Sequence, residues 1–422
     1  MNDSVKAGFR AWLVVGLLFP VALLNYLDRQ MLVTMAVATV VLAAGVCAAE
    51  EPQFSNVFIG GQGGFPAIRI PSLVLTKHGT LLALAEGRAF ARADQANNKI
   101  ILKRSTDFGK TWGDLKIIAD DGTNCLNNPC TVVDQSSGRI VVMFQSYPAH
   151  HRERDRSIKP GLDGRDIVRN YVITSTDEGT TWSPLQDVTR TTKHAERVTI
   201  MASGPGIGIE LQRSVHHLGR IIIPFNEGPF GQWKVLAVFS DDGGKSWQLG
   251  EPAPGCCVTN VSGKLVSLVN EVQMVELSDG SVMLNSRKWG GQAVRKTAVS
   301  SDGGRTWSRI AEEPALRDNG CMASIFRYSF AHKNEPNCLL FSSPDSDKRE
   351  NGTIRVSYDD GKTWPVKKVL CPGSFAYSVL ARLPDGSIGC LFETDDTDRM
   401  VFARFNLSWL SDATASTVPG KY

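Results

Sequence analysis

The sequence predicts an all-β fold, a six-bladed β-propeller of four-stranded antiparallel sheets that follows an apolar N-terminal leader. Two observations favour this fold class. An eight-residue motif recurs five times at a nearly regular interval, and the chain around its copies consists of short β-rich stretches separated by turns. No stretch after residue 50 has the long 3.6-residue period of a helix, which disfavours helical and mixed folds.

The recurring motif reads Ser-x-Asp-x-Gly-x-Ser/Thr-Trp. Its successive copies start 70, 65, 60 and 57 residues apart, and a period of this length indicates one supersecondary unit for each copy. The five copies begin at Ser105, Ser175, Ser240, Ser300 and Ser357.

Each copy of the motif predicts a tight turn within a β-hairpin. Its aspartate can hydrogen-bond the backbone two residues further on, its glycine supplies a positive φ, and its tryptophan returns the chain to the core. A calcium loop of the EF-hand kind is the alternative, but such a loop needs further oxygen ligands, a closing glutamate at its twelfth position and flanking helices. No copy supplies these, so we expect structural turns and no metal.

The strands expected between these turns are short and rich in β-branched residues. Turn signals bound them, for example Lys77-His-Gly and Ser278-Asp-Gly. Five marked units and one unmarked unit, built from the C-terminal strands and the segment after Glu51, give six blades. The stretch 400–407 is expected to pair with early strands and close the ring. In chain order, the expected strand segments are 81–85, 99–103, 140–144, 172–174, 221–224, 235–239, 282–285, 353–356 and 388–392.

The first fifty residues predict a signal or anchor segment. Two apolar runs, 11–27 and 31–49, follow the basic residues Lys6 and Arg10, and the second run ends in small residues as a signal-peptide cleavage site does. We therefore expect an exported protein that is periplasmic, secreted or membrane-anchored. Lipidation at Cys47 is a weaker alternative.

The remaining chain divides into a propeller at 51–410 and a flexible tail at 411–422. Lys plus Arg number 46 and Asp plus Glu 43, a balance that does not suggest nucleic acid as a partner. Export permits disulfides, although cysteine spacing does not determine their connectivity. No pair of Cys-x-x-Cys elements is present, which disfavours zinc, and we expect no cofactor.

The repeats and one further motif resemble the bacterial exo-sialidases, or neuraminidases, of the kind grouped as glycoside hydrolase family 33. The repeats are similar to that family's Asp boxes, and Ile68-Arg-Ile-Pro71 is similar to its N-terminal Phe/Tyr-Arg-Ile-Pro motif. The resemblance covers about residues 55 to 410. Asp boxes also occur in non-enzymatic propellers, so the functional expectation depends on residues outside them.

Arginines at family-like positions carry most of that expectation. The resemblance implies that Arg69, Arg287 and Arg355 bind the carboxylate of sialic acid, because a guanidinium is always charged and presents a planar fork to a carboxylate. Arg355 is placed by its context Gly352-Thr-Ile-Arg, just before the fifth box. Arg88 resembles a family arginine near the hydroxyl groups of the sugar.

The resemblance also implies a tyrosine nucleophile, Tyr377. Sialic acid bears a carboxylate on its anomeric carbon, so a neutral tyrosine approaches it more easily than an anionic carboxylate, and sialidases are the tyrosine exception among glycoside hydrolases. A free phenol has a pKa near 10 and needs a base. Glu271 matches the family's base, and Glu276, five residues on and expected on the opposite side of the strand, is the alternative.

Two further carboxylates complete the predicted site. Asp94 matches the family's general acid, which protonates the departing oxygen and then activates water, with an ordinary exposed loop aspartate as the alternative. Glu393 resembles the glutamate that orients the first arginine, Arg69.

Together these residues predict an exo-α-sialidase that releases terminal sialic acid from glycoproteins, glycolipids or oligosaccharides with retention, through a tyrosyl intermediate. A trans-sialidase and an intramolecular trans-sialidase differ only in what captures the intermediate, so both remain open. A non-catalytic glycan-binding propeller is the alternative from another class, and the joint presence of tyrosine, glutamate and three arginines argues against it.

Overall fold

The structure is a computed structural model that describes residues 50–90, 92–333 and 335–412. The predicted leader at 1–49, with Cys47, and the tail from residue 413 lie outside the described residues. No helix among the described residues is long and apolar enough to cross a membrane.

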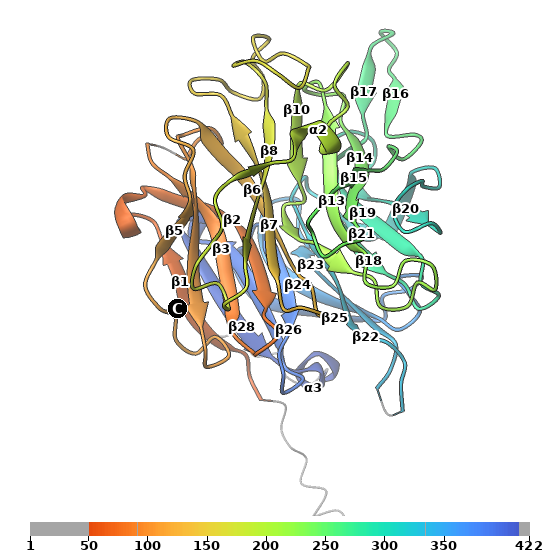
Figure 1. Cartoon of the computed structure of the whole chain (residues 1–422). Coiled ribbons are helices and arrows are strands. Elements are labelled where there is room, and N and C mark those ends of the chain that lie inside the picture. The colour runs from red at the N-terminus through yellow and green to blue at the C-terminus, as the bar shows by residue number, and fades with distance from the viewer. Residues whose placement is uncertain (1–49, 91, 334, 413–422) are drawn as a thin grey trace, which may run out of the picture. The chain divides into compact units, whose positions relative to one another are not determined.

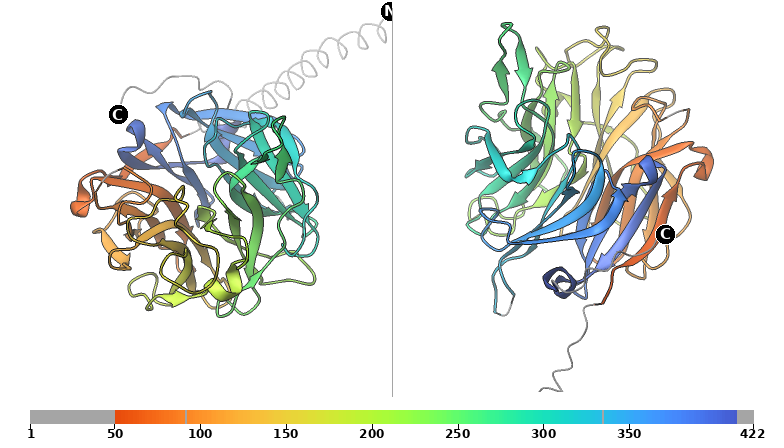
Figure 2. Two further views of the ribbon diagram at one scale, coloured as in Figure 1. Left: turned by 90° about the horizontal axis from the view of Figure 1, so that it is seen from above. Right: turned by 180° about the vertical axis from the view of Figure 1, so that it is seen from behind.

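Six antiparallel sheets form a ring, as the sequence predicts (Figure 1; Figure 2, left). The first three sheets in chain order contain the following strands. One has β2 (Ala67–Leu75), β3 (Leu81–Arg88), β4 (Lys99–Ser105) and β5 (Lys116–Ala119); the next has β6 (Cys125–Val133), β7 (Ile140–Tyr147), β8 (Arg169–Ser175), β9 (Gln186–Asp187) and β11 (Gly206–Ile207); the third has β10 (Ile200–Ser203), β12 (Ile209–Glu210), β13 (Ile221–Gly228), β14 (Lys234–Ser240) and β15 (Gln248–Leu249).

The other three sheets complete the ring. They contain β18 (Val269–Glu276), β19 (Val282–Lys288), β20 (Val294–Ser300) and β21 (Ala311–Arg317); β22 (Ser324–Ser329), β23 (Cys338–Pro344), β24 (Glu350–Ser357) and β25 (Val366–Ser374); and β26 (Ser378–Arg382), β27 (Ile388–Thr394), β28 (Arg399–Phe405) and β1 (Gln53–Ile59). A separate hairpin, β16 (Cys257–Thr259) and β17 (Leu265–Ser267), projects from one end. The short helical elements are η1 (Gln62–Gly64), α2 (Thr189–Thr192), η2 (Asp395–Thr397) and α3 (Leu407–Ser411).

The ring closes by pairing the first described strand with the last. β1 lies antiparallel to β28, with Gln53 opposite Arg404 and Ile59 opposite Arg399. This confirms the predicted sixth blade, built from the C-terminal strands and the segment after Glu51. The chain then turns into α3, a short helix that the sequence pattern did not predict.

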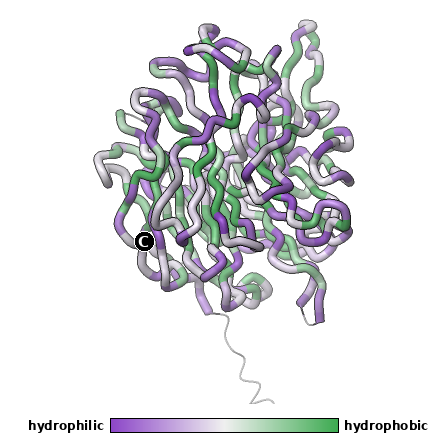
Figure 3. Tube along the Cα trace, in the orientation of Figure 1, coloured by the Kyte–Doolittle hydropathy of each residue, from purple (hydrophilic) through white to green (hydrophobic). Residues whose placement is uncertain are grey.

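Hydrophobic residues lie along the strands, and hydrophilic residues gather in the connecting loops (Figure 3). Every residue of β3, β7 and β13 is buried, because these second strands lie between neighbours within a blade and pack against the adjoining blades. Large side chains such as Phe144, Phe225 and Phe341 fill the space between the sheets. Burial of each contributes roughly 2–3 kcal/mol and holds the blades together.

The five Asp boxes form nearly identical turns between the third and fourth strands of their blades. In the first box the Asp107 carboxylate accepts hydrogen bonds from the Ser105 hydroxyl (2.7 Å), the Thr111 backbone N–H (2.9 Å) and the Thr111 hydroxyl (2.5 Å). The backbone donor is therefore four residues beyond the aspartate, and the predicted bond two residues on is wrong. The turn is longer than the tight hairpin turn that the sequence predicts, and two successive residues in it, Phe108 and Gly109, have positive φ.

Glycine at the fifth position of the box has a second role beyond its φ angle. A Cβ atom at Gly109 would lie 2.1 Å from the Phe402 ring of the preceding blade, and one at Gly179 would lie 3.0 Å from Leu82. The boxes therefore brace each blade against the one before it.

Replacing Asp107 by alanine is expected to destabilise the fold by about 1–2 kcal/mol at pH 7, since three hydrogen bonds to the carboxylate are lost. Burial opposes ionisation, but the hydrogen bonds from Thr111 outweigh it and lower the pKa of Asp107 from its ordinary 3.8. A lowered pKa stabilises the fold above the ordinary value and loses that contribution as the pH falls below it. Chemical denaturation at pH 7 and pH 3 measures this difference, and a folded but inactive variant would contradict the structural role.

All eight cysteines in the described part of the chain are free thiols, six of them buried. The disulfides that export permits are therefore not formed among these residues.

Candidate active site

Most of the predicted site residues come from strand ends at one end of the ring, the end at which β2 and β18 begin. Alternate strands of a blade run in opposite directions, so the start of a first strand lies beside the end of the second. Arg69 and Glu271 lie near the starts of β2 and β18, Arg287 near the end of β19, and Glu393 near the end of β27. Tyr377 directly precedes β26, and the topology thereby brings these five side chains to one place.

Tyr377, Glu271 and Arg287 form the centre of the site. The Tyr377 hydroxyl donates to Glu271 Oε1 at 2.5 Å, and Arg287 Nη1 donates to Glu271 Oε2 at 2.6 Å and to the Tyr377 oxygen at 3.0 Å. Burial and the charge of Glu271 raise the pKa of Tyr377 well above its ordinary value, while Arg287 and Arg349 oppose that shift. The phenol is therefore protonated at neutral pH, and Glu271 is placed to accept its proton.

Arg69 is held by Glu393. Arg69 donates from Nε to Glu393 Oε1 (3.1 Å) and from Nη2 to Oε2 (2.7 Å), a bidentate pair, and the Ile70 N–H donates to the same carboxylate at 2.9 Å. Burial by itself lowers the pKa of Arg69, but the charge and hydrogen bonds of Glu393 outweigh it, so the net shift is upward. The guanidinium is thus a fixed, permanent cation.

A distortion of β2 orients the side chain of Arg69. The register against β3 shifts between Arg69 and Ser72, which is a β-bulge, and Ile70 has a φ of 65°. A β-branched residue rarely adopts a positive φ, and such strain is concentrated at functional sites. The pairing with Glu393 in the neighbouring sheet holds this conformation in place.

The placement of Arg355 in the site is wrong. Arg355 lies in β24 opposite Lys367 of β25, and its Nη2 pairs with Asp345 at 3.0 Å. Its guanidinium extends to Asp345, which directly follows β23, and it forms no hydrogen bond or ion pair with Tyr377, Glu271 or Arg69 among the described residues.

Arg349 occupies the place expected of the third arginine. It precedes β24, and its backbone carbonyl accepts a hydrogen bond from Phe375, two residues before Tyr377, at 2.9 Å. Its guanidinium carbon lies 5.2 Å from the centroid of the Tyr377 ring, and that of Arg69 lies 5.4 Å from it. With Arg287 on the hydroxyl, three guanidinium groups surround the phenol.

Asp94 and Arg88 lie beside this centre. Arg88 is buried and its Nη2 is 3.1 Å from Asp94 Oδ1, whereas the Asp94 side chain is 61% exposed. Asp94 also interacts electrostatically with Arg69. A solvent-accessible carboxylate next to a cation cluster can exchange protons with both a ligand and water.

The sequence reasoning missed three residues here: Arg349, Cys321 and Glu153. Burial raises the pKa of the Cys321 thiol to about 12, and the thiol interacts electrostatically with Arg349 and Arg287. Glu153 lies in the loop after β7; burial, Asp94 and Glu271 raise its pKa to about 7, against the opposing charge of Arg154. A loop rich in charges gave no signal that one of its carboxylates faces the site.

An aromatic cluster lies on the same end of the ring. Phe230, Trp233 and the half-exposed Trp289 meet edge to face with centroids 5.6–6.3 Å apart, and Arg154 lies 5.2 Å from the centroid of Phe230. Trp289 follows Arg287 by two residues, so this cluster stands beside the site.

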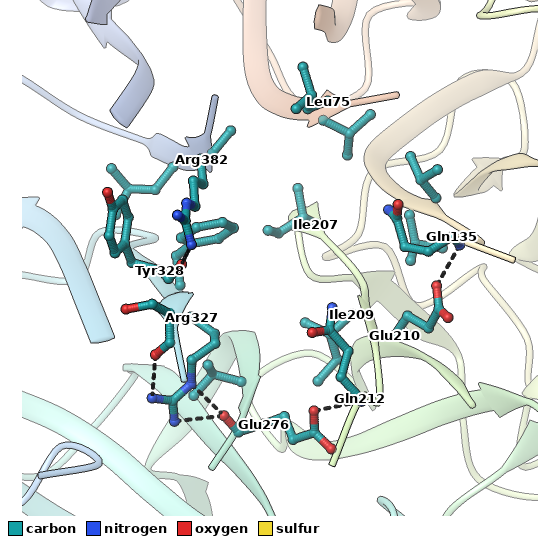
Figure 4. Close-up of a pocket in the computed structure, with 18 of the residues that line it drawn as sticks. Leu75, Gln135, Ile207, Ile209, Glu210, Gln212, Glu276, Arg327, Tyr328 and Arg382 are labelled. Atoms are coloured by element: carbon teal, nitrogen blue, oxygen red, sulfur yellow. Dashed lines mark hydrogen bonds between the residues drawn. The ribbon is translucent and has the colours of Figure 1, made fainter. Parts of the chain in front are cut away.

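A pocket of about 700 Å³ opens at the opposite end of the ring (Figure 4), and none of the predicted site residues lines it. Glu276, the alternative base, lies there, with its carboxylate accepting backbone N–H groups of Gln212, Arg213 and Ser214 at 2.7–2.9 Å. Its position excludes it as a partner of Tyr377.

The three comparisons with known proteins agree with this geometry. A model of the BNR repeat-like domain matches residues 79–390. The chain is 36% identical over 398 residues to a sialidase from Micromonospora viridifaciens, covering 90% of this chain and 58% of that protein. This chain belongs to the family of BNR-repeat sialidases.

A second curated sialidase and a solved sialidase structure are also similar to this chain. A sialidase from Bacteroides fragilis (strain YCH46) is 30% identical over 351 residues, covering 79% of this chain and 61% of that protein. The solved Hadza microbial sialidase Hz136 has a TM-score of 0.75 at 28% identity, covering 85% of this chain and 69% of that chain. This chain therefore spans about three fifths of the length of these two curated relatives.

Proposed function

We propose that this protein is an exo-α-sialidase that hydrolyses terminal sialic acid from glycoproteins, glycolipids or oligosaccharides with retention of configuration. The observation that carries the proposal is the contact of Tyr377 with Glu271 at 2.5 Å inside a cluster of three guanidinium groups. Membership in the sialidase family supports it. The relatives' names give the substrate class, and the residues of this chain give the mechanism.

The arginines account for substrate recognition. Arg69, Arg287 and Arg349 offer planar forks to the carboxylate on the anomeric carbon, and the water-poor surroundings strengthen each charge-assisted hydrogen bond. Binding this carboxylate directs the anomeric carbon toward the Tyr377 oxygen. Glu393 and Glu271 already offset two of the three charges, so a sugar without a carboxylate would forgo the charge-assisted hydrogen bonds of this cluster, which makes the site selective for acidic sugars.

The chemical step begins at Tyr377. Because burial and Glu271 keep the phenol protonated, its attack on the anomeric carbon must accompany transfer of its proton to Glu271 Oε1. Arg287 donates to both oxygens and stabilises the charge that passes between them. The product of this step is a covalent bond between the Tyr377 oxygen and the anomeric carbon, an aryl glycoside of the enzyme, and the aglycone leaves as the bond forms.

Asp94 acts as the general acid for the leaving group. Its carboxylic acid protonates the glycosidic oxygen as the bond to the anomeric carbon breaks, and its carboxylate then removes a proton from the water that releases sialic acid. Its exposure permits exchange with solvent between these two steps. No metal or cofactor is needed for either step. We further propose that the protein is exported from the cell, because sialylated glycans are found outside it.

Proton NMR of the reaction products tests this function. A sialoside incubated with the protein is expected to give the α-anomer of free sialic acid first, followed by mutarotation to the β-anomer. Initial β-anomer would contradict retention. An anhydro-sugar would indicate an intramolecular trans-sialidase, a new glycoside would indicate a trans-sialidase, and intact sialosides of every linkage would favour a glycan-binding propeller.

Replacing Glu393 by glutamine is expected to raise KM by about 10- to 100-fold with a smaller change in kcat. An amide can accept only one of the two Arg69 hydrogen bonds and lacks the compensating charge, so the guanidinium loses its orientation. Steady-state kinetics on a fluorogenic sialoside measure the split. An unchanged KM with a large loss of kcat would contradict the positioning role.

A further inference from the structure

Asp94 lies in an exposed loop, yet its backbone is fixed by buried side chains. Its carbonyl oxygen accepts hydrogen bonds from Asn98 Nδ2 at 2.7 Å and from Asn127 Nδ2 at 2.6 Å. Asn98 and Asn127 are 0% and 2% exposed, respectively. The loop that carries the proposed acid is therefore attached to the core at the acid itself.

One buried carboxylate, Glu86 of β3, organises these contacts. Glu86 is 0% exposed and accepts from Asn98 (3.1 Å), Asn127 (3.2 Å) and the Asn128 N–H (2.7 Å). It also accepts from Arg88 Nε at 3.0 Å and Nη2 at 2.8 Å. Burial raises the pKa of Glu86 above its ordinary value, and the charge of Arg88 and the hydrogen bond from Asn128 oppose that shift. Five donors converge on its two oxygens and leave no acceptor for a carboxyl proton, so we take it as an ionised acceptor.

The same arginine connects Glu86 to the Asp94 side chain. Arg88 Nη2 lies between Glu86 Oε2 (2.8 Å) and Asp94 Oδ1 (3.1 Å), and Arg88 Nη1 donates to the Arg92 carbonyl in the loop at 2.5 Å. Both ends of Asp94, its carbonyl and its carboxylate, are thus oriented by groups that Glu86 holds.

We propose that Glu86 is a positioning residue for the general acid: through Asn98, Asn127 and Arg88 it fixes the place of Asp94, and its charge offsets that of Arg88. The inference rests on the proposed function. A cation beside a carboxyl group favours its carboxylate form, whereas cleavage of a glycosidic bond needs an acid. The Glu86 carboxylate pairs with Arg88 and offsets its charge.

Other charged and titratable groups face Asp94 as well. They are Arg88 of β3, Arg69 of β2, Cys125 of β6, Tyr147 of β7 and Glu153 of the following loop. One of them, Arg88, is itself held by Glu86.

The test compares two leaving groups in the full chain carrying Glu86→Gln. Lactose is a poor leaving group that needs protonation, whereas a methylumbelliferyl phenolate departs with little help. We expect kcat/KM to fall by about 30-fold or more on sialyllactose and by less than about 3-fold on the methylumbelliferyl sialoside. The alkaline limb of kcat/KM on sialyllactose should move down by about one pH unit, because the variant leaves Arg88 uncompensated.

Glu276→Gln is the matched control. Glu276 is also a buried carboxylate that accepts three backbone N–H groups, but it lies at the opposite end of the ring (Figure 4). The Glu276→Gln variant is expected to lower stability without changing the ratio of the kcat/KM values on the two substrates. If Glu86→Gln does not fold, Asn127→Ser is the second variant. It keeps the charge of Glu86 and removes one hydrogen bond to the Asp94 carbonyl. It is expected to show the same leaving-group preference without the pH shift.

Equal losses on both substrates with an unmoved pH profile, in a folded Glu86→Gln protein or in Asn127→Ser, would overturn the inference. Inactivity of the unmodified protein on both substrates would instead contradict the proposed function, so the two failures are distinguishable.

Discussion

Replacing Tyr377 by phenylalanine is expected to lower kcat on sialosides by about 10³- to 10⁴-fold. The change removes one oxygen, the atom that Glu271 and Arg287 both contact at 3.0 Å or less. Without it, the anomeric carbon has no nucleophile within the site, and water must attack a carbon that the arginines hold beside an apolar ring. Binding of the substrate carboxylate stays, so KM should change far less than kcat.

Two measurements check this prediction. Rates on a methylumbelliferyl sialoside give kcat, and mass spectrometry of acid-quenched reactions detects a sialosyl adduct on the peptide that contains Tyr377 in the unmodified protein only. Tyr328→Phe is the control, because the Tyr328 hydroxyl donates to the Gly386 carbonyl at 2.6 Å at the other end of the ring. Full activity in Tyr377→Phe, or an adduct on a different residue, would refute the nucleophile.

Replacing Arg349 by alanine is expected to lower kcat/KM by about 10²- to 10³-fold, whereas Arg355→Ala should leave it within about threefold. Arg349 stands 5.2 Å from the Tyr377 ring centroid, and its loss removes one of three cations that would hold the carboxylate. Arg355 pairs with Asp345 and not with Tyr377 or Glu271, so its loss is expected to affect stability.

The paired variants decide which arginine belongs to the site. Thermal unfolding should show a lower Tm for Arg355→Ala, while isothermal titration with a sialic acid analogue should show weaker binding only for Arg349→Ala. Arg349→Lys is expected to recover part of the binding, since an ammonium keeps the charge but not the planar fork. Loss of binding in Arg355→Ala with retention in Arg349→Ala would reverse the assignment.

The fold was predictable because the repeat motif specifies both a turn and its place in each blade. Asp107, Gly109 and Trp112 recur at fixed offsets, and one supersecondary unit follows from each copy. The detail that escaped is the length of the turn. Besides the glycine, the residue before it has positive φ, as Phe108 does in the first box. The residue type does not reveal this, because that position holds Phe, Glu, Gly or Asp in the five copies.

The site was predictable where a residue has a local motif, as Arg69 and Glu271 do. Arg349 has none: it precedes β24 and reaches the site only because that strand runs from the site end toward the box. Arg355, two residues before Ser357, has the family-like context but lies deeper in that strand, so sequence context alone does not separate the two arginines.

Closure of the ring also governs when the protein can act. Arg69 and Glu393 are 324 positions apart, and Glu393 belongs to the sheet that β1 and β28 complete. Contacts of such sequence separation form late in folding, so a chain emerging from the ribosome acquires the pair of Arg69 and Glu393 only after Glu393 has been synthesised. A sialoside bound by Arg69 would slow the separation of the sheet that contains β1 and β28 from its neighbour, and would protect the amides of that sheet from hydrogen exchange. Substrate would therefore stabilise β1 and β28 together.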